Sequence, residues 1–212
     1  MLADRRHFIA TAAALGLLAA CGGAAGGASA ETGDIVLGRA DAPVTMIEYA
    51  STMCPACADF HARILPQIKA NYVDTGKVKF IFREFATEPR EFAYAGFMMA
   101  RCVGSTPEKY HEMIAVLFQQ QRAIFESARI GQGREKLLEI ARTAGMSEEQ
   151  FSACVTDPAG IERIRKVEAG ALEQFKLTGT PTIIIDGEVI PNTIEAPYSY
   201  ESLAARIDAR AK

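Results

Sequence analysis

Two cysteines, Cys54 and Cys57, stand three positions apart with Pro55 between them, directly after an apolar run of strand length. Pro55 suits the first turn of a helix, because the N–H that proline lacks would have no partner there. The spacing therefore predicts that Cys54 lies at a helix N-terminus and Cys57 one turn further in. Unpaired backbone N–H groups and the helix dipole favour negative charge at that terminus, so we expect Cys54 to ionise readily.

This arrangement suits exchange between a dithiol and a disulfide. A free thiol with a pKa of about 8.5 is only slightly ionised at neutral pH, whereas cysteines in such sites reach pKa values of about 3.5 to 7.5. We expect Cys54 to be the attacking and leaving sulfur. Cys57, within reach but more buried, would resolve the mixed disulfide.

A metal site is the competing interpretation, because Cys54, Cys57 and His61 fall on one face of the expected helix. A closed zinc site has four ligands, however, and the other histidines are His7, near the N-terminus, and a lone His111. We therefore expect neither a metal nor another cofactor. We place His61 on the helix surface.

Glu48 is a carboxylate in an otherwise apolar run, six residues before Cys54. Burying a carboxylate costs several kcal/mol unless it has a partner or a task. On the strand that leads into the cysteine turn, Glu48 should lie beneath the pair, where it could accept or return the proton of Cys57. The alternative is an exposed glutamate on an edge strand.

The elements that must position these residues follow from the apolar spacing. The run "APVTMIEYAS" is apolar on both sides, as in a central strand, and a helix interrupted at Pro66 follows it. "GKVKFIFREF" is a second strand, which completes the strand–helix–strand unit of a parallel pair. The pattern is then helical from Glu88 to about Leu177. "TIIIDGEVI" predicts a hairpin that turns at Asp186-Gly187, and "SYESLAARIDARA" a closing helix.

Three separated motifs carry a resemblance to a known family. "CPAC" at the start of a helix, Glu48 on the preceding strand and "TGTPT" before "IIIDG" together resemble the thioredoxin superfamily. The long helical block before Pro181 is similar to the DsbA-like thiol:disulfide oxidoreductases. The resemblance covers nearly all of residues 34–212 and implies an α/β thioredoxin fold with an inserted helical domain. The expected domains are a thioredoxin-like domain of residues 34–87 and 157–212, and a helical insertion of residues 88–156.

The resemblance also implies roles for individual residues. By base rate the Thr180-Pro181 bond would be trans, since only about 5–6% of X-Pro bonds are cis. The resemblance instead implies a cis-proline, with Thr180 offering backbone hydrogen bonds to an extended substrate. Ala56 departs from the family pattern, because the best-known oxidases carry His there. We therefore expect a milder oxidising power. The implied catalytic residues are the nucleophile Cys54, the resolving Cys57, the buried carboxylate Glu48, Thr180 and Pro181.

The first 33 residues are typical of an export signal followed by a flexible linker. A basic segment precedes an apolar run, which is shorter than the roughly 20 residues needed to span a bilayer. Arg5-Arg6 with Phe8 resembles a twin-arginine signal, although Asp4 weakens the match. "LAAC", ending at Cys21, resembles a lipoprotein lipobox, whereas "ASA" at residues 28–30 resembles an ordinary cleavage site. We expect export to the periplasm and slightly favour lipidation of Cys21.

Export changes the meaning of the other cysteines. Of five in total, four remain once Cys21 is lipidated or removed, in a compartment where disulfides persist. Among three possible pairings we prefer Cys102 with Cys154, because Cys54 and Cys57 already form a local pair. Two separate buried thiols are the alternative.

The composition excludes other classes of protein. The formal charge is −3 and no basic run occurs, so the footprint of a nucleic-acid binder is missing. The sequence predicts a monomeric oxidoreductase that oxidises reduced, unfolded secreted proteins and is reoxidised by a membrane thiol oxidase. It would contact the membrane only through a lipid anchor. Alternatives are a reductase or isomerase on the same scaffold, or a metal-binding module of Cys54, Cys57 and His61. The redox direction depends on how the fold stabilises the thiolate.

Overall fold

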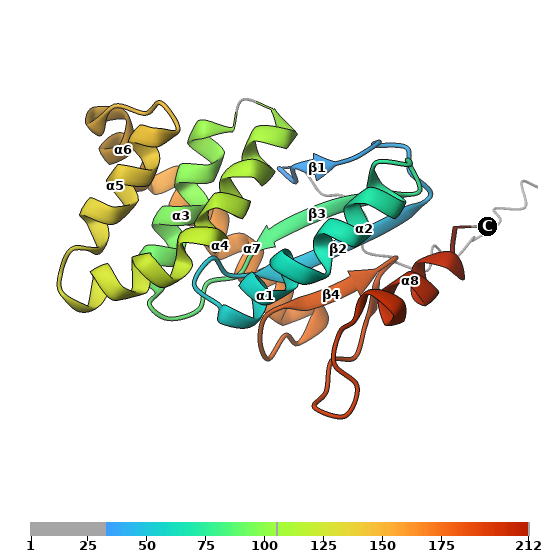
Figure 1. The fold of residues 1–212 in the computed structure, drawn as a ribbon. Coiled ribbons are helices and arrows are strands. Elements are labelled where there is room, and N and C mark those ends of the chain that lie inside the picture. Colours follow the sequence, from blue (N-terminus) through green and yellow to red (C-terminus); the bar gives the residue numbers. More distant parts are fainter. Residues whose placement is uncertain (1–32, 105, 212) are drawn as a thin grey trace, which may run out of the picture.

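The computed structural model describes residues 33–104 and 106–211. The expected export signal, with its lipidation candidate Cys21, lies outside these residues. Figure 1 shows a twisted sheet with helices on both faces and a further group of helices at one end. This is the α/β fold with a helical insertion that the sequence predicts.

A sheet of five strands forms the centre of the molecule. Its order is β1-β3-β2-β4-β5, with β2 and β3 parallel and the other neighbours antiparallel. All seven residues of β2 are buried, because both faces of this strand are covered. The strands are β1 (Val36–Leu37), β2 (Val44–Ala50), β3 (Val78–Glu84), β4 (Thr182–Ile185) and β5 (Glu188–Val189).

The side chains of β2 alternate between two cores. Met46 and Ala50 belong to the larger core, together with residues of α1 (Pro55–Arg63) and α8 (Tyr200–Asp208). Ile47 and Tyr49 belong to a smaller core beneath α7 (Pro158–Phe175). In Figure 1, α1 and α8 lie in front of the sheet and α7 lies behind it. The predicted central strand, apolar on both sides, is confirmed.

Two local predictions are also confirmed. Pro66 interrupts the first helix, since α1 ends at Arg63 and α2 (Leu65–Ile68) leads into a π-helical segment (Lys69–Val73). The hairpin of β4 and β5 turns at Asp186 and Gly187. Their φ values of +48° and +86° are those of a tight hairpin turn.

The helical block contains α3 (Arg90–Val103), α4 (Pro107–Arg129), α5 (Gly133–Thr143) and α6 (Glu148–Val155), followed by α7. No described residue between β3 and β4 is in a strand, as predicted. Figure 1 shows α3 to α6 gathered beyond one end of the sheet, whereas α7 returns beneath it. Helices α3 to α6 thus fall within the proposed insertion of residues 88–156, and α7 falls outside it.

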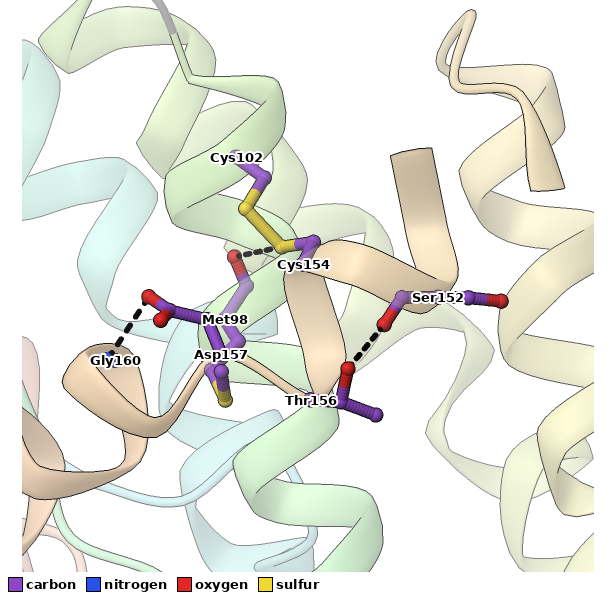
Figure 2. The surroundings of a disulfide bond; sticks show 7 residues. All are labelled: Met98, Cys102, Ser152, Cys154, Thr156, Asp157 and Gly160. Carbon is purple, nitrogen blue, oxygen red and sulfur yellow. Dashed lines mark hydrogen bonds between the residues drawn. A yellow bond between two sulfur atoms is a disulfide. The ribbon is translucent and has the colours of Figure 1, made fainter. Parts of the chain in front are cut away.

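A disulfide joins two helices of this block. Cys102 of α3 and Cys154 of α6 are bonded, 52 positions apart in the sequence (Figure 2). The Sγ of Cys154 lies 3.1 Å from the carbonyl oxygen of Met98, a close contact in which neither atom carries a proton. The structure therefore contains the pair, not two separate thiols.

A buried ion cluster fastens the helical block to the end of β3. The carboxylate of Glu84 accepts hydrogen bonds from Arg101 of α3 at 2.6 Å and from Arg163 of α7 at 3.1 Å. The hydroxyl of Tyr110 on α4 donates to the same carboxylate at 3.3 Å. Three helices thus meet at one strand end, which fixes how the block sits beside the sheet.

Candidate active site

The two cysteines of "CPAC" lie where β2 gives way to α1. Cys54 is the N-cap of α1, and the backbone N–H groups of Cys57 and Ala58 both donate to its carbonyl oxygen at 3.1 Å. Both cysteines are free thiols, and Cys57 is fully buried whereas Cys54 keeps 8% of its surface exposed. One sulfur therefore reaches the surface and the other lies behind it.

The surroundings of Cys54 favour its thiolate. The thiol of Cys57 hydrogen-bonds to its sulfur and, together with the backbone N–H groups of Ala56 and Cys57, lowers the pKa of Cys54 from 9.0 to about 6, although burial acts in the opposite direction. Most copies of the reduced protein therefore carry a thiolate at this position at neutral pH.

The pKa of Cys57 moves in the opposite direction. Burial raises it well above 9.0, and the hydrogen bond to Cys54 and the negative charge of Glu48 act in the same sense. Cys57 therefore keeps its proton at neutral pH and must lose it before it can attack. Cys54 is therefore ionised and nucleophilic at neutral pH, whereas Cys57 becomes a nucleophile only after a base removes its proton.

Glu48 is fully buried on the central strand, so the alternative of an exposed edge-strand glutamate is wrong. It occupies the same face of β2 as Met46 and Ala50, which share the larger core with Cys57. One of its oxygens, Oε2, lies 2.7 Å from Nε2 of His61, whereas Oε1 has no hydrogen-bond partner.

His61 corrects an expectation from the sequence. The placement of this residue on the helix surface is wrong, because only 7% of its side chain is exposed. Its ring packs 4.2 Å from the ring of Phe118, between centroids, and 6.0 Å from that of Phe82. The sequence spacing could have predicted this burial. His61 follows Cys57 by one helical turn, so a buried Cys57 places His61 on the same inward face of the helix.

The loop before β4 completes the site. The Thr180-Pro181 bond is cis and Pro181 is buried. The Sγ of Cys54 lies 3.3 Å from the carbonyl oxygen of Thr180, to which it donates when it is protonated, across 126 positions of sequence. A second cis bond, Glu88-Pro89, was not among the sequence predictions. The structure therefore brings together Cys54, Cys57, Glu48, Thr180 and Pro181, the five residues that the resemblance implied.

Gln121 of α4 also touches the site, and the sequence prediction did not include it. Its buried Nε2 donates to the carbonyl oxygens of Thr52 at 2.8 Å and of Cys54 at 3.0 Å. The helical block thus holds the backbone of the cysteine turn. The signal was a polar residue one turn after Leu117, within an apolar stripe.

Two further features bear on the expected alternatives. Among residues 33–104 and 106–211, no group of three or more His, Cys, Asp or Glu side chains could hold a metal ion. The Nε2 of His61, the third member of the expected metal set, is already bonded to Glu48. Within the same residues, no helix combines the length and the apolar character needed to cross a bilayer.

Comparison with known proteins gives consistent matches. The model of the thioredoxin family matches residues 30–209. A Rickettsia bellii protein named as a protein-disulfide oxidoreductase is 30% identical over 177 residues, which are 82% of this chain and 63% of that protein. Disulfide bond formation protein D of Bacillus subtilis is 24% identical over 76% of this chain and 71% of its own length. The chain thus spans about 60% of the rickettsial relatives that it matches.

Solved structures give the same result at the level of the fold. Alpha-DsbA1 of Wolbachia pipientis superposes with a TM-score of 0.75 at 25% identity, over 86% of this chain and 93% of the other. Oxidised BdbD of Bacillus subtilis superposes with a TM-score of 0.71 at 22% identity, over 87% and 96% of the two chains. The second likeness is one of fold.

Proposed function

Because the chain belongs to the thioredoxin family and is a DsbA-like member of it, we propose that it is an exported thiol:disulfide oxidoreductase that introduces disulfides into secreted proteins. The observation that carries the proposal is the pair of opposite pKa shifts. Cys54 has a pKa of about 6, and Cys57, directly behind it, has one well above 9.0. A site that ionises only its outer sulfur can exchange disulfides with another protein.

The proposed reaction begins with the Cys54–Cys57 disulfide. A thiolate of the reduced substrate attacks the sulfur of Cys54, and Cys57 leaves with the electron pair and takes up a proton. A second substrate thiolate then attacks the substrate sulfur of the mixed disulfide, and Cys54 leaves as a thiolate. The substrate gains one disulfide and the protein gains two electrons. The low pKa of Cys54 makes it a good leaving group in the last step.

The direction of exchange follows from the same pKa. An interaction that stabilises the thiolate stabilises the reduced protein relative to its disulfide, and so makes the disulfide a stronger oxidant. This supports donation of the disulfide over a reductase or isomerase role, which would keep the pair reduced. Reoxidation would then pass the two electrons to a membrane thiol oxidase.

A shallow groove beside Cys54 could receive an extended, unfolded substrate. It runs between α1 and the loop that follows β5, and it is lined by Phe60, Ile64, Pro181, Pro197 and Tyr198 among others. The largely apolar lining suits the exposed side chains of an unfolded chain. We infer export from the signal-like residues 1–33, with a lipid anchor at Cys21 as the favoured form.

Redox titration against glutathione tests the direction. A potential near ~−120 to −180 mV is expected for a disulfide donor, and a value near ~−270 mV would indicate a reductase. Iodoacetamide labelling of Cys54 should reach half its maximal rate near pH 6. A labelling rate at pH 7 equal to that of free cysteine would contradict the proposal.

Two variants test the roles of the sulfurs. Reduced Cys57→Ser should accumulate a mixed disulfide when it is mixed with glutathione disulfide. Cys54 attacks the reagent, one glutathione thiolate leaves, and the resolving sulfur is missing. Cys54→Ser should form none. The double variant Cys102→Ala/Cys154→Ala serves as the matched control, and it should exchange disulfides as the unmodified protein does. Trapping by Cys54→Ser in place of Cys57→Ser would reverse the assignment of the nucleophile.

A further inference from the structure

Cys57 has no evident way to lose or gain its proton. Its side chain is fully buried, and its pKa lies well above 9.0 because of burial. The outer side of the pair is occupied by Cys54, and by the substrate while a mixed disulfide exists. Each turnover nevertheless requires Cys57 to take up or release one proton.

We propose that His61 is a positioning residue that, with Glu48, conducts this proton between Cys57 and a cleft on the side of α1 away from the substrate groove. The inference rests on the proposed function, since it assigns a route to a step of that reaction. It goes beyond the role of Glu48, because a fully buried carboxylate cannot exchange protons with solvent unaided.

The first link is the hydrogen bond between Glu48 and His61. Oε2 of Glu48 and Nε2 of His61 are 2.7 Å apart, within a core where Glu48 has no exposed surface. Oε1 of the same carboxylate is buried without a hydrogen-bond partner. A buried acceptor without a partner is unusual, because most buried polar atoms in proteins are hydrogen-bonded. The charge of Glu48 acts on Cys57, so we assign this oxygen as the acceptor of the Cys57 proton, through one bridging water.

The second link is the position of the imidazole. His61 lines a cleft of about 550 Å³ between α2, α4 and the segment after β1. This cleft shares no lining residue with the groove beside Pro181. Among the titratable side chains, imidazole is suited to carry protons near neutral pH. His61 therefore joins the buried carboxylate to solvent by a route that a bound substrate does not cover.

Other titratable and charged groups line the cleft beside His61 or interact with its ring. Negative charge comes from Glu48 on β2 and from Glu108 and Glu112, which line the cleft from α4. Positive charge comes from Arg39 before β2 and from Lys69 after α2. The remaining groups around the cleft and the ring are Asp74, His111 and, one turn earlier on α1, Cys57.

The proton balance of each step is simple. When a substrate sulfur attacks Cys54, Cys57 leaves as a thiolate and takes one proton from the Glu48–His61 pair, and cleft water returns one proton to the ring. On reoxidation, the thiolate of Cys54 first attacks a partner disulfide, and one partner sulfur leaves as a thiolate. Cys57 then gives its proton to Glu48, and its sulfur attacks Cys54 in the mixed disulfide. The second partner sulfur leaves with the electron pair, and the ring releases one proton to the cleft.

The test separates attack from resolution. Reduced protein is mixed with excess glutathione disulfide, quenched in acid at intervals, and analysed by mass for the mixed disulfide and the Cys54–Cys57 disulfide. His61→Gln retains an N–H donor for Glu48 but cannot relay a proton, and His61→Phe suits the surrounding aromatic rings. In both variants attack by Cys54 should keep its rate. Resolution by Cys57 should slow by about 10²-fold at pH 7, the lower end for a positioned acid–base group.

The pH dependence distinguishes a relay from a merely structural contact. The deficit of the variants should shrink as the pH rises, because hydroxide can then take the proton. His111→Gln is the matched control, since His111 lines the same cleft but bonds to the carbonyl oxygen of Ile35, not to a carboxylate. The control should resolve at the unmodified rate.

Several outcomes would overturn the inference. One is a His61→Gln protein that resolves the mixed disulfide at the unmodified rate and with the unmodified pH profile. Another is a His61→Phe protein whose resolution is slowed equally at every pH, while His61→Gln restores the rate. If His61→Phe fails to fold, His61→Gln and the solvent isotope effect decide, because unmodified protein should resolve more slowly in D2O. Absence of any exchange in the unmodified protein would instead refute the proposed function itself.

Discussion

At the scale of single residues, one hydrogen bond separates the two cysteines chemically. The thiol of Cys57 donates to the sulfur of Cys54, so the bond favours charge on Cys54 and disfavours it on Cys57. The pKa values of the pair therefore move apart. Identical side chains thereby acquire the two roles that disulfide exchange requires.

The thiolate of Cys54 should make the stability of the reduced protein depend on pH. Its pKa is about 6 in the folded protein and lies near 9.0 in the unfolded chain, so the folded thiolate is favoured. The stabilisation should be complete above about pH 9 and lost as the pH falls through 6. Urea unfolding of the reduced and oxidised proteins from pH 5 to 9 measures it. Reduced protein should gain relative to oxidised protein as the pH rises, and a constant difference would contradict this prediction.

The sequence was informative where a residue type was out of place or a motif was complete. Cys54 and Cys57 follow from their spacing, and Glu48 from a carboxylate in an apolar strand. Pro181 needed the family resemblance, because the base rate favours a trans bond. His61 was misplaced because the face of a short helix is hard to assign when its exposed residues, such as Asp59 and Arg63, lie close by. Its burial depends on the partner Glu48, which only tertiary structure brings near.

At the scale of elements, α4 extends from the helical block to the cysteine turn. Gln121 supplies two hydrogen bonds there, to Thr52 and Cys54, from a side chain that is 6% exposed. The turn is therefore held from outside its own domain. The orientation of the backbone N–H groups that point towards Cys54 depends on these two hydrogen bonds.

Gln121→Leu tests that support. The change keeps the volume but removes the Gln121 donor from the buried carbonyl oxygens of Thr52 and Cys54. The oxygen of Cys54 keeps its bonds from the N–H groups of Cys57 and Ala58, so the loss falls mainly on Thr52. The free energy of unfolding should therefore fall by about 1–3 kcal/mol. The labelling midpoint of Cys54 should also move upward from about pH 6, because the turn is held less firmly. Gln119→Leu, on an exposed position of the same helix, is the control and should change neither value. An unchanged midpoint in a destabilised Gln121→Leu protein would limit Gln121 to a role in stability.

His111 of α4 should make the fold sensitive to acid. Burial lowers its pKa from 6.5 to about 4, although its hydrogen bond with the carbonyl oxygen of Ile35 acts in the opposite direction. The unfolded chain therefore binds a proton first, and stability falls as the pH drops from 6.5 to 4, by at most about 3 kcal/mol. His111→Gln should remove this part of the acid loss in urea unfolding at a series of pH values. An identical pH dependence in the variant would contradict it.

The elements were predictable where their patterns are long. β2, β3 and the helical block follow from runs of apolar residues at strand or helix spacing. β1 was missed because it has only two paired residues, Val36 and Leu37, and a pattern needs more. The π-helical segment depends on how the chain continues beyond Pro66, which no periodicity describes.

At the scale of the whole molecule, an ion cluster joins the helical block to the sheet, and a disulfide links two helices within the block. The Glu84 cluster joins β3 to α3, α4 and α7. The Cys102–Cys154 disulfide joins α3 to α6. Neither link joins residues that are near one another in the sequence. Glu84 and Arg163, for example, are 79 positions apart. Pairing of the two cysteines was predictable only by counting them.

Removal of the disulfide should destabilise the protein without altering its exchange chemistry. Closing a loop of 52 positions contributes about 4 kcal/mol in the chain-entropy model. Cys102→Ala/Cys154→Ala should therefore lose stability of that order in urea unfolding. Iodoacetamide labelling of Cys54 should keep its midpoint near pH 6. A shifted midpoint would mean that the disulfide influences the cysteine turn through α3 or α6.

The described part of a newly made chain carries four cysteines, and two of them must be joined before the helical domain is braced. If the proposed activity holds, an older copy can carry out that oxidation, so the enzyme is also a client of its own kind. A cell depleted of working copies would then recover slowly at first and faster as finished ones accumulate. On this proposal, the bond between Cys102 and Cys154 would make the protein's maturation self-reinforcing.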